Sequence, residues 1–179
     1  MVLVLKNCGK NMAINLQPYK YKIYKPDYYS FVTDSGIEYT CYFSPYAEYF
    51  KSYPAVISSK FFAFNLELVD KKKKISGTDK RIADTIITIV GDFLNSKINA
   101  VVYICDNSDG REAARARKFL SWYRFYEHPS HKIIKVSGNL DAGDIILHTT
   151  LLIHKNNKLK KELVQAYLEL IDYDDDDEK

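Results

Sequence analysis

The stretch AVVYICDNSDGREAARARKFLSWYRFY, residues 100–126, decides the fold of this chain. Its first part, Ala100 to Cys105, is an apolar run long enough for a buried strand, and it ends in a cluster of turn formers, Asp106 to Gly110. Asp109 and Glu112 have the spacing of a capping box, so we expect a helix to begin there. The stretch therefore predicts a strand, a tight acidic turn and an amphipathic, arginine-rich helix.

Another helix is predicted just upstream, between a capping residue, Thr78 or Asp79, and the polar turn at residues 95–99. Its apolar positions share one helical face because they recur at helical spacing. They are Ile82, Ile86, Ile89, Val90 and Phe93. A strand at residues 61–69, which alternates large apolar with polar side chains, is expected to precede it.

The N-terminal part predicts a hairpin and an edge strand. Residues 28–32 and 37–43 flank a turn-rich linker that ends in Gly36, where φ can be positive. Residues 19–25 interleave lysine with aromatic and apolar side chains, which is typical of an edge strand protected by charges. Interleaved Lys and Tyr can also follow a nucleic-acid backbone, but we do not expect nucleic acid as a partner.

Downstream of the opening stretch, we expect a strand at residues 132–136, a loop at 137–143 and a strand at 145–153. A final helix is marked by four apolar positions, Leu159, Leu163, Ala166 and Leu170. The order is β-β-β-α-β-α-β-β-α, with the early edge strand in front. This order predicts an α+β fold, with a mixed, mostly antiparallel sheet and helices on its faces.

Length and composition indicate one soluble domain. A chain of 179 residues can bury roughly 70% of its unfolded surface in a single core. Its three cysteines are odd in number and show no paired spacing, so no disulfide framework or zinc site is predicted. The apolar start is too short for a signal peptide or a membrane span. We expect a cytoplasmic protein that does not contact a membrane.

The net charge of +3 hides an asymmetry between the body and the C-terminus. Without residues 172–179, the chain has 25 basic and 17 acidic residues. We therefore expect a loosely ordered arm at 1–17, one α+β domain at 18–171 and an acidic tail at 172–179. The tail is a solvated end, or it lies across a basic face and competes with an anionic partner.

Two segments carry a resemblance to the acyl-CoA N-acyltransferase (GNAT) superfamily. They are LVDKKKKISGTDKRIADTII, residues 68–87, and VVYICDNSDGREAARARKFLSWYRFYEH, residues 101–128. In that superfamily, a meander strand leads into a pyrophosphate-binding turn and helix, and the next strand leads into a second helix. The amino-acid sequence around CDNSDGR also resembles an uncharacterised family of small Bacteroidota proteins. This resemblance implies a bacterial origin.

The resemblance implies a site for acetyl-CoA at the start of the helix after the third meander strand. A helix N-terminus offers unpaired N–H groups to a pyrophosphate, and nearby cations add attraction. The residues that would take this cofactor-binding role are Lys74, Gly77, Thr78, Asp79, Lys80 and Arg81. The superfamily's loop has two closely spaced glycines where this chain has only Gly77, and Asp79 would place a carboxylate beside the phosphates.

The resemblance also implies catalytic candidates. Glu67 would act as general base or position a water toward an amine, and Tyr123 or Tyr126 would protonate the departing thiolate. The simpler alternative makes Glu67 a solvent-facing strand residue and both tyrosines packing residues.

No metal site is predicted, because His148 and His154 share a strand face without further ligands at suitable spacing. Asp106 and Asp109 at the carboxyl end of a strand could coordinate Mg²⁺, but no other carboxylates at ligand spacing support this, and capping is the favoured role of Asp109.

Two classes of function remain open on the sequence. One is a non-catalytic or degenerate GNAT-like binding protein, for which a protein is the first partner to consider. The alternative is an acyl-CoA-dependent N-acyltransferase that acts on an unknown amine. The sequence does not decide whether the protein is an enzyme, because its altered loop supports the first class and its order of elements supports the second.

Overall fold

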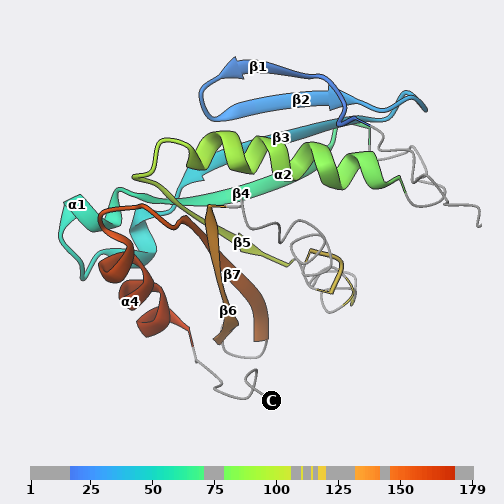
Figure 1. Cartoon of the computed structure of the whole chain (residues 1–179). Helices are drawn as coiled ribbons and strands as arrows, with labels where there is room; N and C mark the ends of the chain where they lie inside the picture. Colours follow the sequence, from blue (N-terminus) through green and yellow to red (C-terminus); the bar gives the residue numbers. More distant parts are fainter. Residues whose placement is uncertain are drawn as a thin grey trace, which may run out of the picture.

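Seven strands form one mixed sheet in the order β1-β2-β3-β4-β5-β7-β6 (Figure 1). The computed structural model describes residues 17–70, 79–105, 110, 114, 117–119, 132–141 and 146–171. The strands are β1 Tyr21–Lys25, β2 Tyr28–Val32, β3 Glu38–Pro45, β4 Phe61–Leu68, β5 Ala100–Ile104, β6 Ile133–Asp141 and β7 Ile146–His154. Neighbouring strands are antiparallel except β4 and β5, which are parallel. The predicted α+β class with a mostly antiparallel sheet is confirmed.

The helices α2 Lys80–Leu94 and α4 Lys160–Leu170 form where the sequence predicts helices. The 3-10 turn η1 Ala47–Phe50 and the short helix α1 Ala55–Ser58 lie between β3 and β4. Ala114 and residues 117–119 are also helical, inside the helix predicted after Gly110. The predicted cap Asp109 and its partner Glu112 lie outside the described residues.

The hairpin between β2 and β3 forms as predicted around Gly36. This glycine has φ 72°, a conformation that costs a residue with a side chain more than it costs glycine. The Thr33 N–H donates to the Ile37 carbonyl at 2.9 Å, and the Gly36 N–H donates to the Thr33 carbonyl at 2.9 Å. The closed turn sets the register in which Phe31 faces Tyr39.

The sheet separates two hydrophobic cores. The apolar face of α2, with Ile86, Ile89 and Leu94, packs on the side chains of one face of β1 to β4. The second core joins η1, α1 and α4 to the other face of β5, β6 and β7. Adjacent residues of β5 belong to different cores, since Val101 packs with α2 whereas Ala100 and Val102 pack with α4. Figure 1 shows α2 along β3 and β4, and α4 beside the β6–β7 hairpin.

One prediction is wrong in its described part. The loop expected at residues 137–143 is strand as far as Asp141, because β6 stays paired with β7 through Ser137↔Thr150, Gly138↔Thr149 and Asn139↔His148. Gly138 serves close packing here, since a Cβ at this position would collide with Ile171 Cδ1. Strand pairing therefore overrides the turn preference of Ser, Gly and Asn.

No helix among the described residues is long and apolar enough to cross a membrane.

Candidate functional site

The parallel strands β4 and β5 run side by side over only three positions. Their pairs are Phe61↔Ala100, Phe62↔Val101 and Ala63↔Val102. Beyond these pairs, the described part of β4 pairs only with β3, and that of β5 only with β7. Both strands end at the same edge of the sheet because they are parallel, and ligands of open sheets with parallel strands bind at such carboxyl ends. The segments 68–87 and 101–128, singled out in the sequence, both include the chain that follows these strands.

Asp79 is the N-cap of α2. The sequence predicted either Thr78 or Asp79 in this position. Its backbone is extended, and its Oδ1 accepts a hydrogen bond from the Arg81 backbone N–H at 2.9 Å. Its Oδ2 accepts a hydrogen bond from the Tyr19 hydroxyl at 2.5 Å. One carboxylate thus satisfies an otherwise unpaired helical N–H group and places a negative charge at the positive end of the helix.

Tyr19 closes this end of the helix from the side of the N-terminal segment. The residue is only 6% exposed, and its backbone N–H donates to Thr85 Oγ1 at 2.8 Å. Its hydroxyl oxygen also accepts a hydrogen bond from the Asp34 N–H at 3.4 Å. Burial first, and then the hydrogen bond to Asp79, raise the pKa of the Tyr19 hydroxyl, so it stays protonated and acts as a donor at neutral pH.

The guanidinium group of Arg81 contacts other residues of the chain. Its Nε donates to the Gln17 carbonyl at 2.9 Å, and its Nη1 forms a 2.5 Å ion pair with Asp34 Oδ2. Its guanidinium carbon lies 3.8 Å from the centroid of the Tyr19 ring, a cation–π contact. The positive charge that the sequence assigns to cofactor binding is therefore engaged in contacts within the chain.

Glu67 lies on the opposite face of the sheet from α2. Leu66 and Leu68, its neighbours in β4, pack against the core that contains α2, so the alternation of the strand turns Glu67 away. Its exposed carboxylate accepts a hydrogen bond from the Tyr42 hydroxyl at 2.7 Å. That bond is the main reason why the pKa of Tyr42 is raised. The structure does not bring Glu67 onto the same face as the N-terminus of α2.

The other predicted site residues are placed as follows. Lys80 is exposed at the first position of α2. The remaining candidates, Lys74, Gly77, Thr78, Tyr123 and Tyr126, lie outside the described residues.

Sequence reasoning missed Tyr19 and Asp34 as parts of this site. Tyr19 was interpreted only as the start of an alternating strand, and Asp34 only as a turn former. No spacing rule links either residue to Asp79 or Arg81, which are dozens of positions away in the chain.

The described residues hold no group of three or more His, Cys, Asp or Glu side chains suited to a metal ion. Cys41 is fully buried, and burial raises the pKa of its thiol to about 12. A thiol in this state is a poor nucleophile at neutral pH.

The fold and the start of α2 define the class: an α+β protein in which the helix that follows β4 is capped by the side chain of Asp79. The chain belongs to a family of unknown function (DUF6169), whose match covers residues 78–169. The matched residues run from the cap of α2 to the last turn of α4. No curated protein and no solved structure matches the chain.

Proposed function

We propose that this protein is a non-catalytic binding protein on a GNAT-like scaffold, and that its phosphate-binding helix end has been converted into an internal contact. The observation that carries the proposal is the Asp79 carboxylate, which accepts hydrogen bonds from both the Arg81 N–H and the Tyr19 hydroxyl. In this proposal the protein acts by binding a partner, and the first partner class to test is another protein.

Electrostatics support this reading of the helix end. A pyrophosphate at a helix N-terminus uses free N–H groups and the positive end of the helix dipole. Here the Asp79 carboxylate already accepts the Arg81 N–H and lies at the positive end of the dipole. A second negative charge about 4 Å away would be repelled by roughly 1 kcal/mol in water and 4 kcal/mol near a protein surface. Arg81 offers little compensation because Asp34 already neutralises it.

Packing supports it as well. At the described start of α2, the Tyr19 ring lies against Arg81 and the Tyr19 hydroxyl donates to Asp79. A cofactor phosphate that approached Asp79 and Arg81 would meet two side chains that are already bonded to Tyr19, Gln17 and Asp34.

The second candidate is an acyl-CoA-dependent N-acyltransferase, favoured by the short parallel pairing of β4 and β5. In this alternative, acetyl-CoA binds along residues 74–81, Glu67 serves as base and Tyr123 or Tyr126 serves as acid. Replacing Glu67 by Gln would then lower turnover of an amine acceptor by about 10²–10⁴-fold. Full turnover of that variant would remove Glu67 from the mechanism.

Thermal unfolding with and without 1 mM acetyl-CoA separates the two candidates. If the dissociation constant were about 10 µM, this ligand would stabilise the folded state by roughly 2.7 kcal/mol and raise the midpoint by on the order of 5–10 °C. The binding-protein proposal expects an unchanged midpoint. A rise of that size would instead support the acyltransferase, and the search for an amine acceptor would follow.

A further inference from the structure

His154, the last residue of β7, has a buried ring nitrogen without a partner. Its side chain is 2% exposed, and its Nδ1 accepts a hydrogen bond from the Asn156 backbone N–H at 3.1 Å. Because Nδ1 is the acceptor, the neutral ring carries its proton on Nε2. Nε2 has no hydrogen-bond partner in the structure. A buried donor of this kind normally has an acceptor, so its presence requires an explanation.

Three lysines flank this end of β7 from separate segments of the chain. Lys97 lies in the turn after α2, Lys132 directly precedes β6, and Lys155 directly follows β7. The Lys155 N–H donates to the Lys132 carbonyl at 2.5 Å, and the Asn157 side chain donates to the Asn99 carbonyl at 3.3 Å. These bonds tie the end of β7 to the start of β6 and to the turn that contains Lys97.

The positive charges of these lysines act on His154, and no acidic group offsets them among the causes of its pKa shift. Burial is the first cause that lowers the pKa of His154, and the positive charges of Lys97, Lys132 and Lys155 follow. No carboxylate among the described residues forms an ion pair with any of the three lysines. Asp92, in the last turn of α2, accepts a hydrogen bond from the Tyr21 hydroxyl and is thereby engaged with β1.

Lys97 is held in an unusual backbone conformation. Its φ is 58°, and it is the one non-glycine residue with positive φ in the part of the chain that the structure describes. Glycine is the usual residue at such a helix end, because a side chain makes the left-handed conformation less favourable. Strain of this kind occurs at functional sites, where the side chain is needed. A lysine at the C-terminus of a helix is also favourable for the dipole, but this does not account for Lys132 and Lys155.

We propose that His154, Lys97, Lys132 and Lys155 form a binding site for a phosphate-class anion. The Nε2–H of His154 donates a hydrogen bond to a phosphate oxygen, and the three ammonium groups balance its charge. Phosphate suits this set better than a carboxylate, because it offers more acceptor oxygens and a second negative charge to three compact cations.

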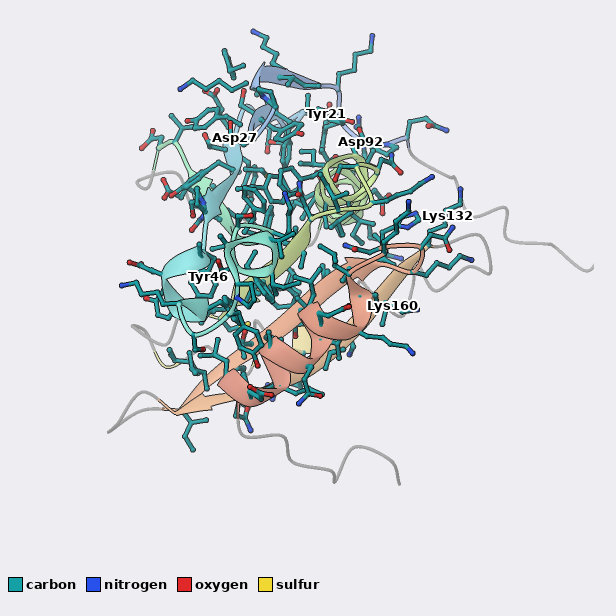
Figure 2. The ribbon with its side chains drawn as sticks, turned by 90° about the vertical axis from the view of Figure 1, so that its left-hand side faces the viewer. Tyr21, Asp27, Tyr46, Asp92, Lys132 and Lys160 are labelled. Carbon is teal, nitrogen blue, oxygen red and sulfur yellow. The ribbon has the colours of Figure 1, made fainter. Side chains whose placement is uncertain are left out.

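The site is separate from the start of α2. Lys97 follows the C-terminal end of α2, and 15 helical residues at about 1.5 Å each place the two ends roughly 20 Å apart. Figure 2 shows Lys132 between Asp92, near the end of α2, and Lys160, at the start of α4. The proposal therefore does not depend on the proposed function.

Titration with inorganic phosphate at constant ionic strength tests the proposal. The proton and nitrogen resonances of the His154 ring, followed by NMR, should shift and saturate with phosphate at millimolar concentrations. Replacing Lys97 or Lys132 by Ala should weaken phosphate binding about tenfold each. Replacing Lys158, an exposed lysine on the turn after β7, should change it less than twofold.

Replacing Lys97 by Gly separates binding from folding. This variant should raise the urea midpoint of unfolding, because glycine adopts positive φ more easily, and yet bind phosphate about tenfold more weakly. Lys97→Arg, which keeps the charge, should retain binding within about threefold.

Two results would overturn the site. His154 resonances that do not move in 100 mM phosphate would show that Nε2 does not meet this anion. Equal weakening by Lys97→Ala and Lys158→Ala would reduce the effect to general attraction by a basic surface.

Discussion

The guanidinium group of Arg81 lies on the ring of Tyr19, 3.8 Å from its centroid, although 61 residues separate the two positions in the chain. Through this contact and the hydrogen bond from Tyr19 to Asp79, the segment before β1 is attached to the first turn of α2. The start of α2 is thus an intramolecular joint between the helix and that segment. Contacts at this joint and elsewhere in the fold should have measurable effects on the stability of the protein.

Replacing Tyr19 by Phe should lower the free energy of unfolding by about 1 kcal/mol. The variant keeps the ring contacts with Arg81 and Phe31 but loses the hydrogen bonds of the hydroxyl to the exposed Asp79 and from the Asp34 N–H. Urea denaturation measures the change.

Tyr24→Phe is the matched control, because Tyr24 is 60% exposed and its contact with Tyr28 involves only the rings. It should change the free energy of unfolding by less than about 0.5 kcal/mol. Equal losses in the two variants would mean that the Tyr19 hydroxyl contributes nothing specific.

Replacing Gly138 by Ala should destabilise the protein by about 1–3 kcal/mol, because the added Cβ would collide with the Ile171 side chain. Shortening Ile171 to Ala in the same chain makes room, so the double variant should lose less than the sum of the two single losses. Strict additivity would show that the two side chains do not compete for this space.

Gly91→Ala provides the opposite control. Gly91 is inside α2, and a Cβ there would meet no atom within 4 Å. Alanine should therefore raise the free energy of unfolding by about 0.5–1 kcal/mol through its better helix propensity. A loss instead of a gain at this position would contradict the geometry of α2.

The pH dependence of stability should carry a contribution from His154. Its pKa in the folded protein is below the ordinary value of 6.5, first because of burial and then because of the neighbouring lysines. As the pH falls through 6.5, the unfolded chain takes up this proton before the folded protein does. The contribution is therefore complete above about pH 6.5 and is lost progressively at lower pH.

Urea denaturation between pH 7.5 and 5.5 in phosphate-free buffer measures this effect. His154→Gln removes the titrating group, while the other three histidines stay the same in both proteins. The wild-type free energy of unfolding should fall more steeply with decreasing pH than that of the variant. Parallel curves would mean that His154 titrates alike in the folded and unfolded states.

Much of the fold could be predicted because its determinants are local. The alternation in residues 61–69 marks β4, the spacing of Ile82, Ile86 and Ile89 marks α2, and Gly36 marks the turn between β2 and β3. The prediction failed at Gly138 and Asn139, where pairing with β7 decides the structure and local turn preference does not.

The candidate site could be predicted only in part. Asp79 was one of two predicted caps, with Thr78, because a helix cap is a local feature with a clear residue preference. Its contacts with Tyr19 depend on how the first described segment returns to α2, which only the folded sheet determines. The pairing of β5 with β7 likewise decides that the turn before β5, which contains Lys97, lies near the end of β7, where His154 is.

The acetyl-CoA response of the wild-type protein and of Asp79→Ser, measured side by side by thermal unfolding, tests the central claim most directly. Serine is also a good helix cap, so α2 should remain intact while the carboxylate is removed. We expect no shift of the wild-type midpoint with 1 mM acetyl-CoA and a measurable rise in the variant. A rise of on the order of 5–10 °C in the wild-type protein would contradict the claim that Asp79 and Tyr19 close this helix end.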